Sequence, residues 1–184
     1  LMLYFNKRVL SQAGIQDPPK TWTEFVDQCR QIKAKTGKFA YAVSVDCSMI
    51  AGMIFSFGGE IVSGRTTLFD SPASLHAFEI IETLAKEKLA YQISPNTYDD
   101  GTAFGQDNVA FTFRSSSGRT SIKTLMGDAQ DQWGMTIIPQ KDPAHPHTVL
   151  FGPNVCIFNT TPEQQRAAWD FVKFFTSPEI SVKW

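Results

Sequence analysis

LYFNKRVLSQAGIQDPPKTWTEF, residues 3–25, is the stretch that decides the fold. It predicts a strand, a short helix that ends at Gly14 in the left-handed conformation, a rigid spacer of two prolines and a second helix. Thr21 and Glu24 stand at the spacing of a capping box, worth about 1 kcal/mol at that helix start. A strand that passes directly into helices is the unit from which α/β folds are built.

The composition describes a folded protein and excludes several classes of partner. The 184 residues are 42% hydrophobic and 19% charged, enough for one domain or for one lobe and part of another. A net charge of −1 leaves no basic surface for nucleic acid or anionic lipid. No apolar run approaches the ~20 residues that cross a bilayer, and no secretory signal segment opens the chain.

Hydrophobic periodicity divides the rest of the chain into alternating helices and strands. Helices are predicted over residues 22–36, 49–57, 72–89, 99–105, 122–125, 162–176 and from 178. Strands are predicted over 39–45, 108–113, 133–138 and 149–158, and a small exposed hairpin or edge piece over 65–69. Such alternation predicts an α/β fold, with helices on both faces of a mixed sheet. Because helix 49–57 is apolar on every side, we expect its Ile50, Ile54 and Phe55 to be buried.

Several local features carry further predictions. Ser48 is expected to cap helix 49–57. Cys29, on an apolar helix face, and Cys156, inside an apolar strand, are expected to be buried thiols, because the odd number of cysteines shows no CxxC pair. The buried face of helix 72–89 is expected to consist of Leu75, Phe78, Ile81 and Leu84.

Residues 115–121 are the segment best suited to a polar ligand. They follow the end of a predicted strand and lead into a helix, where free backbone N–H groups attract an anion or a polyol. The hydroxyls of Ser115, Ser116 and Ser117 and the Arg119 guanidinium would add donors. The plain alternative is a solvated serine-rich loop with an ordinary helix cap.

Two further residues are candidates for the same cleft. Asp46 follows a predicted strand, and ligand clefts of open α/β sheets lie at such strand ends. Its carboxylate would accept hydroxyl donors from a polyol and repel a phosphate; alternatively it only helps to cap the next helix. Asn154 would donate and accept hydrogen bonds, or it serves only the turn beside Pro153.

No catalytic or metal-binding pattern emerges from the sequence. His145 and His147 flank a proline without a third ligand at zinc-site spacing, and there is no GxSxG, HExxH or P-loop lysine. We therefore expect neither enzymatic activity nor a metal or cofactor. The alternative is a small α/β phosphate-handling or hydrolase-like enzyme that uses the serine-rich turn.

Six segments resemble, in order and spacing, those of extracellular solute-binding proteins of sugar-transporting ABC systems. Residues 3–25 resemble that family's LYYNKDLF-KAGL-PPKTWDEF, which there marks the crossover from the first lobe to the second. The other five are FGGE at 57–60, AFGQDNVAF at 103–111, WGMTIIP at 133–139, VLFG at 149–152 and AAWDFVKFFTSPE at 167–179.

The chain departs from the sugar binders where their aromatic residues stack on the solute. It has RSSSG at 114–118 where most members carry SGPWA, and this looks more like the ASSGS of the glycerol-3-phosphate-binding branch. Gly152 and Asn154 stand where the family has GGWG, and they complete the expected ligand-binding set.

The resemblance implies a location and a function. It implies a periplasmic or extracellular protein, lipid-anchored or free, that binds a sugar, polyol or glycerol phosphate and delivers it to an ABC transporter permease. It also implies a type II periplasmic-binding-protein fold in which residues 1–146 form the second lobe and residues 147–184 return to the first.

That division leaves an apolar helix without cover. The helix Pro162–Thr176 carries a stripe of large apolar side chains, and leaving such a stripe in water is costly. We therefore expect self-association through this helix, with residues 139–146, which contain three prolines, as the hinge.

Overall fold

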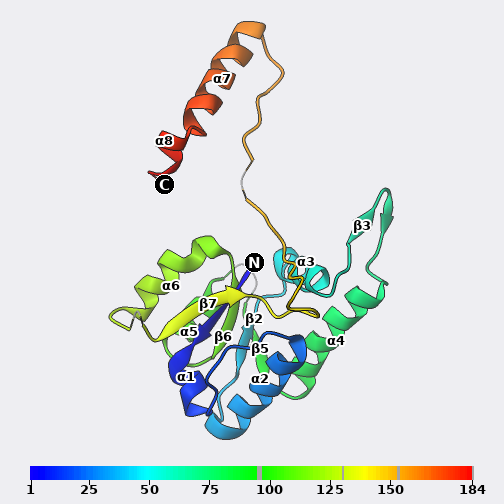
Figure 1. Ribbon diagram of the computed structural model, residues 1–184, viewed down its shortest axis with the longest axis vertical. Coiled ribbons are helices and arrows are strands. Elements are labelled where there is room, and N and C mark those ends of the chain that lie inside the picture. The colour runs from blue at the N-terminus through cyan, green and yellow to red at the C-terminus, as the bar shows by residue number, and fades with distance from the viewer. Residues whose placement is uncertain (95–96, 130, 153, 184) are drawn as a thin grey trace. The chain divides into compact units, whose positions relative to one another are not determined.

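The computed structural model describes residues 1–94, 97–129, 131–152 and 154–183. It divides into two units, Leu1–Leu150 and Phe151–Trp184, and the division falls four residues after the boundary expected from the sequence. The first unit contains the sheet and most of the helices, and the second contains α7 (Pro162–Phe175) and α8 (Pro178–Ser181) (Figure 1).

The main sheet of the first unit is mixed, as expected. Its order is β5-β2-β6-β1-β7, with β5, β2 and β6 mutually parallel and β1 antiparallel to both β6 and β7. The strands are β1 (Met2–Asn6), β2 (Tyr41–Val43), β5 (Ala90–Gln92), β6 (Phe111–Arg114) and β7 (Trp133–Ile137). The helices are α1 (Lys7–Gln12), α2 (Trp22–Thr36), α3 (Cys47–Ser56), α4 (Pro72–Lys86), α5 (Asp99–Gly105) and α6 (Arg119–Met126).

Helices cover both faces of this sheet, because successive strand side chains point to opposite faces. Leu3 and Tyr41 belong to a core shared with α1, α2, α3 and α4, whereas Tyr4 and Ala42 pack with α5 and α6 (Figure 1). The first core is centred on Phe25, whose ring meets four other aromatic rings: Trp22, Tyr41, Phe111 and Phe113. The α/β prediction is confirmed.

The opening stretch folds as its sequence predicts. The strand β1 passes directly into α1, and the chain turns at Gly14 with φ of 78°. Thr21 and Glu24 form both hydrogen bonds of the capping box at the start of α2. The apolar helix α3 is also buried as expected: Ile54 is fully buried, and Ile50 and Phe55 are partly buried.

Other expectations are wrong in whole or in part. Of the face expected in α4, Leu84 is buried and Ile81 is partly buried, but Leu75 and Phe78 are exposed. The helix is also buried through the small side chains of Ser74 and Ala77. The described residues of 149–158 form no strand, because no described strand lies beside them to pair with. Cys156 is consequently exposed, whereas Cys29 is buried as expected, and burial raises the pKa of its thiol.

Residues 139–146 are part of the first unit and do not form a free hinge. The backbone N–H of Gln140 donates to Lys20 at 2.9 Å, and that of Lys141 donates to Ser56 at 3.0 Å. The Gln140 side chain accepts from the His147 N–H at 2.8 Å. These bonds hold the segment against α2 and α3.

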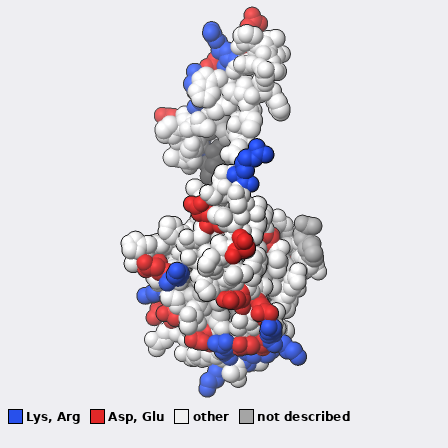
Figure 2. Space-filling model, turned by 90° about the vertical axis from the view of Figure 1, so that its right-hand side faces the viewer, with Lys and Arg blue, Asp and Glu red and all other residues white. Residues whose placement is uncertain are grey.

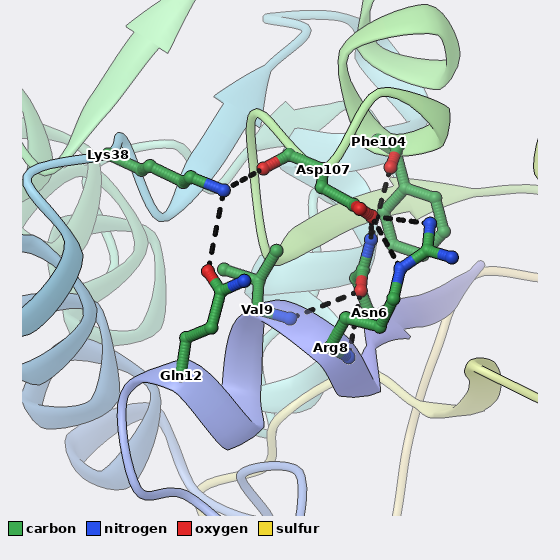
Figure 3. Close-up of polar contacts among 7 residues, drawn as sticks. All are labelled: Asn6, Arg8, Val9, Gln12, Lys38, Phe104 and Asp107. Carbon is green, nitrogen blue, oxygen red and sulfur yellow. Dashed lines mark hydrogen bonds and ion pairs between the residues drawn. The ribbon is translucent and has the colours of Figure 1, made fainter.

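A polar cluster fastens the end of β1 to the loop after α5 (Figure 3). Buried Asn6 donates to the Asp107 carboxylate at 2.6 Å and accepts from the backbone N–H groups of Arg8 and Val9, so it also caps α1. The Arg8 guanidinium lies 2.8 Å from the same carboxylate. Lys38 donates to the Asp107 carbonyl at 2.7 Å.

This cluster predicts an acid-sensitive contribution to stability. Burial alone would raise the pKa of Asp107, but hydrogen bonds from Arg8 and Asn6 outweigh it and lower that pKa. A lowered folded-state pKa gives stability that is full above the unfolded-state pKa, about 4, and is lost as the pH falls through the folded-state pKa.

We therefore expect Asp107→Asn to unfold more easily than the wild type at pH 6 to 8, with the difference closing below about pH 4. The measurement is urea unfolding across this pH range. Asparagine suits this substitution because Asp107 has φ of 58°, a left-handed conformation that asparagine also adopts readily. A difference that persists unchanged at pH 2 would contradict the assignment.

Candidate functional site

The carboxyl ends of β2, β5 and β6 meet at one edge of the sheet because these strands are parallel. Each strand is followed there by a polar segment: residues 44–46 after β2, residues 93–94 and 97–98 after β5, and residues 115–118 after β6. This edge is where open α/β sheets form ligand clefts.

A hollow of about 370 Å³ lies at this edge between the segments that follow β2 and β5. Its size falls in the usual range for small-molecule pockets, about 300–1,000 Å³. Tyr98 lines it and is 79% exposed, so the aromatic ring is available to a ligand. The lining residues are Ser44, Val45, Asp46, Gln92, Ile93, Ser94, Thr97 and Tyr98.

Asp46 lines this hollow and also caps α3. Its carboxylate accepts from the backbone N–H groups of Ser48 at 2.8 Å and Met49 at 3.0 Å, and from the Ser44 hydroxyl at 2.9 Å. The expectation that Ser48 is the cap is therefore wrong, because the helix starts two residues earlier than expected, at Cys47. The two roles foreseen for Asp46 are compatible: its oxygen that bonds Ser44 keeps a further acceptor position.

The serine-rich segment follows β6 and leads into α6, as predicted. Residues Ser116–Gly118 form a short 3₁₀ turn, and the Ser115 hydroxyl accepts from the Ser117 N–H at 3.3 Å and lies 2.9 Å from the Ser117 hydroxyl. Ser116, Ser117 and Arg119 are exposed. The Ser115 and Ser117 hydroxyls thus form some of their hydrogen bonds within the turn. The role of the serine-rich segment in ligand binding stays a prediction.

Tyr4 anchors this turn from below. Its hydroxyl donates to the Ser115 carbonyl at 2.9 Å. Burial raises the pKa of Tyr4, although the positive charges of Arg114 and Arg119 oppose the shift. The Tyr4 hydroxyl is therefore protonated at neutral pH and can donate this hydrogen bond, which ties the serine-rich turn to β1.

A buried ion pair links the turn to the hollow. The Arg114 guanidinium donates to the Asp100 carboxylate at 2.7 Å, with side-chain exposures of 11% and 7%, and Thr112 donates to the same oxygen at 2.6 Å. The guanidinium carbon lies 5.6 Å from the centre of the Tyr98 ring, close enough for a cation–π interaction. The pair thus supports the aromatic wall of the hollow.

The structure brings only part of the predicted set to this edge. Asp46, Ser115, Ser116, Ser117 and Arg119 all lie on segments that start there. Gly152 and Asn154 belong to the second unit, in a segment without helix or strand, and their role stays a prediction.

Sequence reasoning missed Gln92 and Tyr98 in the hollow, and it missed the pairing of Asp100 with Arg114. Gln92 ends β5, a strand of three residues that was not predicted because 89–93, LAYQI, does not alternate in polarity. Tyr98 immediately precedes the helix that was correctly predicted over 99–105. This position, close to the strand ends, is the sequence feature that could have indicated a place in the site.

Metal-ligand clusters, long apolar helices and basic surface stripes are the features of other classes of site. No three His, Cys, Asp or Glu side chains of the described ranges come together as metal ligands would, and His145 bonds Asp142 at 2.8 Å. Among the described residues no helix combines the length and apolar character needed to cross a bilayer. Figure 2 shows basic and acidic side chains interspersed on the face drawn, without the basic stripe typical of nucleic-acid binders.

Comparison with known proteins gives one family over the whole chain. Residues 1–184 match the family model described as bacterial extracellular solute-binding protein. Among curated relatives, the sn-glycerol-3-phosphate-binding periplasmic protein UgpB of Yersinia enterocolitica is 22% identical over 200 residues, which cover 100% of this chain and 44% of the relative. The corresponding protein of Brucella abortus is 23% identical and covers 99% and 44%.

Solved structures show the same fold. The GacH receptor of Streptomyces glaucescens, solved unliganded and with acarbose, superposes with a TM-score of 0.81 at 22% identity, over 97% of this chain and 47% of that one. The sugar-binding protein MalE of Xanthomonas citri gives 0.82 at 18% identity, over 99% and 47%. The chain therefore spans about half the length of the proteins it matches.

Proposed function

We propose that this chain, which belongs to the bacterial extracellular solute-binding proteins, binds a small polyhydroxylated solute at the edge where β2, β5 and β6 end. The solute classes are those suggested by the sequence: a sugar, a polyol or a glycerol phosphate. The chain holds the solute without changing it chemically. Nothing in the comparisons supports the alternative of a hydrolase-like enzyme.

The hollow beside Asp46 and Tyr98 is the observation that carries this proposal. The Asp46 carboxylate, three Ser and Thr hydroxyls and the Gln92 amide meet there with an exposed aromatic ring. Polar groups that fix orientation beside an apolar face are the usual composition of a small-molecule site. A sugar or polyol offers both hydroxyl groups and C–H faces to such a surface.

We propose that the whole protein works outside the cytoplasmic membrane and delivers its solute to an ABC transporter permease. The family description and the periplasmic relatives support this location. We also propose that residues 151–184 belong to the first lobe of the whole protein, in line with their separation from residues 1–150.

Ligand titration of the 184-residue chain tests the binding proposal. A solute that binds only the folded chain raises its melting temperature by mass action. Two-dimensional NMR of ¹⁵N-labelled chain, at solute concentrations up to tens of millimolar, would also locate the binding. We expect shifted amides at Asp46, Gln92 and Tyr98; turnover of the solute would contradict the proposal.

Tyr98→Ala should weaken sugar binding by about 1 kcal/mol, because it removes the aromatic face of the hollow. Tyr98→Phe, the matched control, keeps the ring and should retain most of the affinity. NMR titration of the three proteins gives the comparison. Equal affinity of the alanine variant and the wild type would exclude Tyr98 from the site.

We further propose that the 184-residue chain associates with a second copy through α7. Trp169 is 53% exposed, and Phe171 and Phe174 are each 59% exposed. Multi-angle light scattering should give a dimer that Phe171→Ser weakens. A monomer at every concentration would contradict this prediction.

A further inference from the structure

The Tyr98 side chain has little protein around it. The Tyr98 carbonyl accepts a hydrogen bond from the Gly101 N–H at 3.0 Å, so the first turn of α5 holds its main chain. Its side chain, however, is 79% exposed, and an exposed side chain changes rotamer freely unless a neighbour restrains it. The orientation of the ring therefore depends on the few groups that touch it.

The Arg114 guanidinium is one such group. Its carbon lies 5.6 Å from the centre of the Tyr98 ring, within the distance of a cation–π interaction. The Arg114 side chain is only 11% exposed, and its Nη1 donates to the Asp100 carboxylate at 2.7 Å. Thr112 donates to the same carboxylate oxygen at 2.6 Å and so restrains Asp100 in turn. The exposed ring thus contacts a buried cation that is held in one place.

Two glycines leave the space that this cation occupies. A Cβ on Gly101 would lie 2.6 Å from Nη1 of Arg114 and 3.3 Å from its Cζ, and the first of these distances is shorter than a real Cβ contact. In the serine-rich turn, a Cβ on Gly118 would lie 3.4 Å from Nε. Glycine within a helix costs about 1 kcal/mol relative to alanine, so helix propensity disfavours it at position 101. The room that the guanidinium needs accounts for the glycine there.

We infer that Arg114 and Gly101 are positioning residues: the glycine admits the guanidinium, and the guanidinium holds the Tyr98 ring in its place at the hollow. Neither residue lines the hollow itself, so both act through Tyr98. The inference rests on the proposed function, because the orientation of the ring matters to a solute that touches it. It holds for any class of solute.

The chain without solute gives the first test. Gly101→Ala should displace the guanidinium, because the new methyl group needs the space of Nη1, while the charge of Arg114 is kept. NMR of the chain with ¹³C-labelled tyrosine rings should then show shifted signals for the Tyr98 ring. Thr102→Ala, at an exposed position of the same helix, is the matched control and should leave these signals unchanged.

Arg114→Lys is the second variant and serves if Gly101→Ala fails to fold. Lysine keeps a positive charge beside the buried Asp100 carboxylate, but it lacks the planar group that stacks on an aromatic ring. We therefore expect the Tyr98 ring signals to shift in this variant as well. If the ring signals of both variants match those of the wild type, the inference is wrong, whether or not a solute binds.

Titration with maltose, glycerol and sn-glycerol 3-phosphate gives the decisive comparison. Gly101→Ala should weaken the tightest of these by about threefold, less than removal of the ring itself, and Thr102→Ala should not weaken it. In a Tyr98→Ala background, Gly101→Ala should have no further effect, because a residue that acts through the ring then has nothing to act on. Losses that add in the double variant would overturn the inference. A wild-type chain that binds none of the three would count against the proposed function, and the ring signals would still decide the inference.

Discussion

Phe25→Ala is expected to lower the free energy of unfolding by about 3–5 kcal/mol, the usual cost of removing a fully buried phenyl ring. Phe25 is 0% exposed, and its ring lies 5.3 to 5.8 Å from those of Trp22, Tyr41 and Phe111. The alanine variant would leave a cavity among these rigid rings, which collapse poorly around a void.

Two variants control this measurement by urea unfolding. Phe78→Ala makes the same change on α4, where the side chain is 40% exposed, and should cost far less than the Phe25 variant. Phe25→Leu keeps most of the buried volume and should cost about 1–2 kcal/mol. Similar costs for Phe25→Ala and Phe78→Ala would show that the aromatic cluster is not the centre of this core.

Arg114→Met should be comparably damaging, at about 3–5 kcal/mol, because it strands the buried Asp100 carboxylate without its cation. The substitution keeps the length and apolar stem of the side chain, so the cost reports the lost charge pairing more than lost packing. Thr112 alone would remain as a donor to Asp100.

The double variant Asp100→Asn/Arg114→Met is the decisive comparison. Removing both charges of a buried pair is often nearly neutral, so the double variant should be more stable than Arg114→Met alone. Urea unfolding of both single variants and the double variant closes the cycle. A double variant less stable than both singles would show that the two side chains act independently.

The sequence predicted best those features that depend on neighbouring residues. Thr21 and Glu24 are three positions apart, and the capping box needs no information from the rest of the chain. Helix 99–105 and the turn at Gly14 were likewise predicted from local signals and are confirmed.

Features set by distant packing were harder to predict. Leu75 and Phe78 have helical spacing like a buried face, yet both are exposed, and the helix is buried through Ser74, Ala77 and Leu84. Asp46 and Ser48 are both good caps two residues apart, and only the packed helix decides between them. Tyr98 is a single exposed aromatic with no periodicity, so its place in the site depends on β5, a strand of three residues that sequence patterns did not reveal.

The position of β1 within the sheet has a consequence for folding kinetics. This strand comes first in the unit yet pairs on both sides, with β6 and β7, and Tyr4 reaches Ser115 at a separation of 111 positions. Such distant pairing must close a long loop before it gains any contact, and high contact order slows folding. A ribosome-bound chain would therefore keep β1 unpaired until β6 and β7 emerge, and a chaperone that shields exposed strands during synthesis should raise the yield of folded protein.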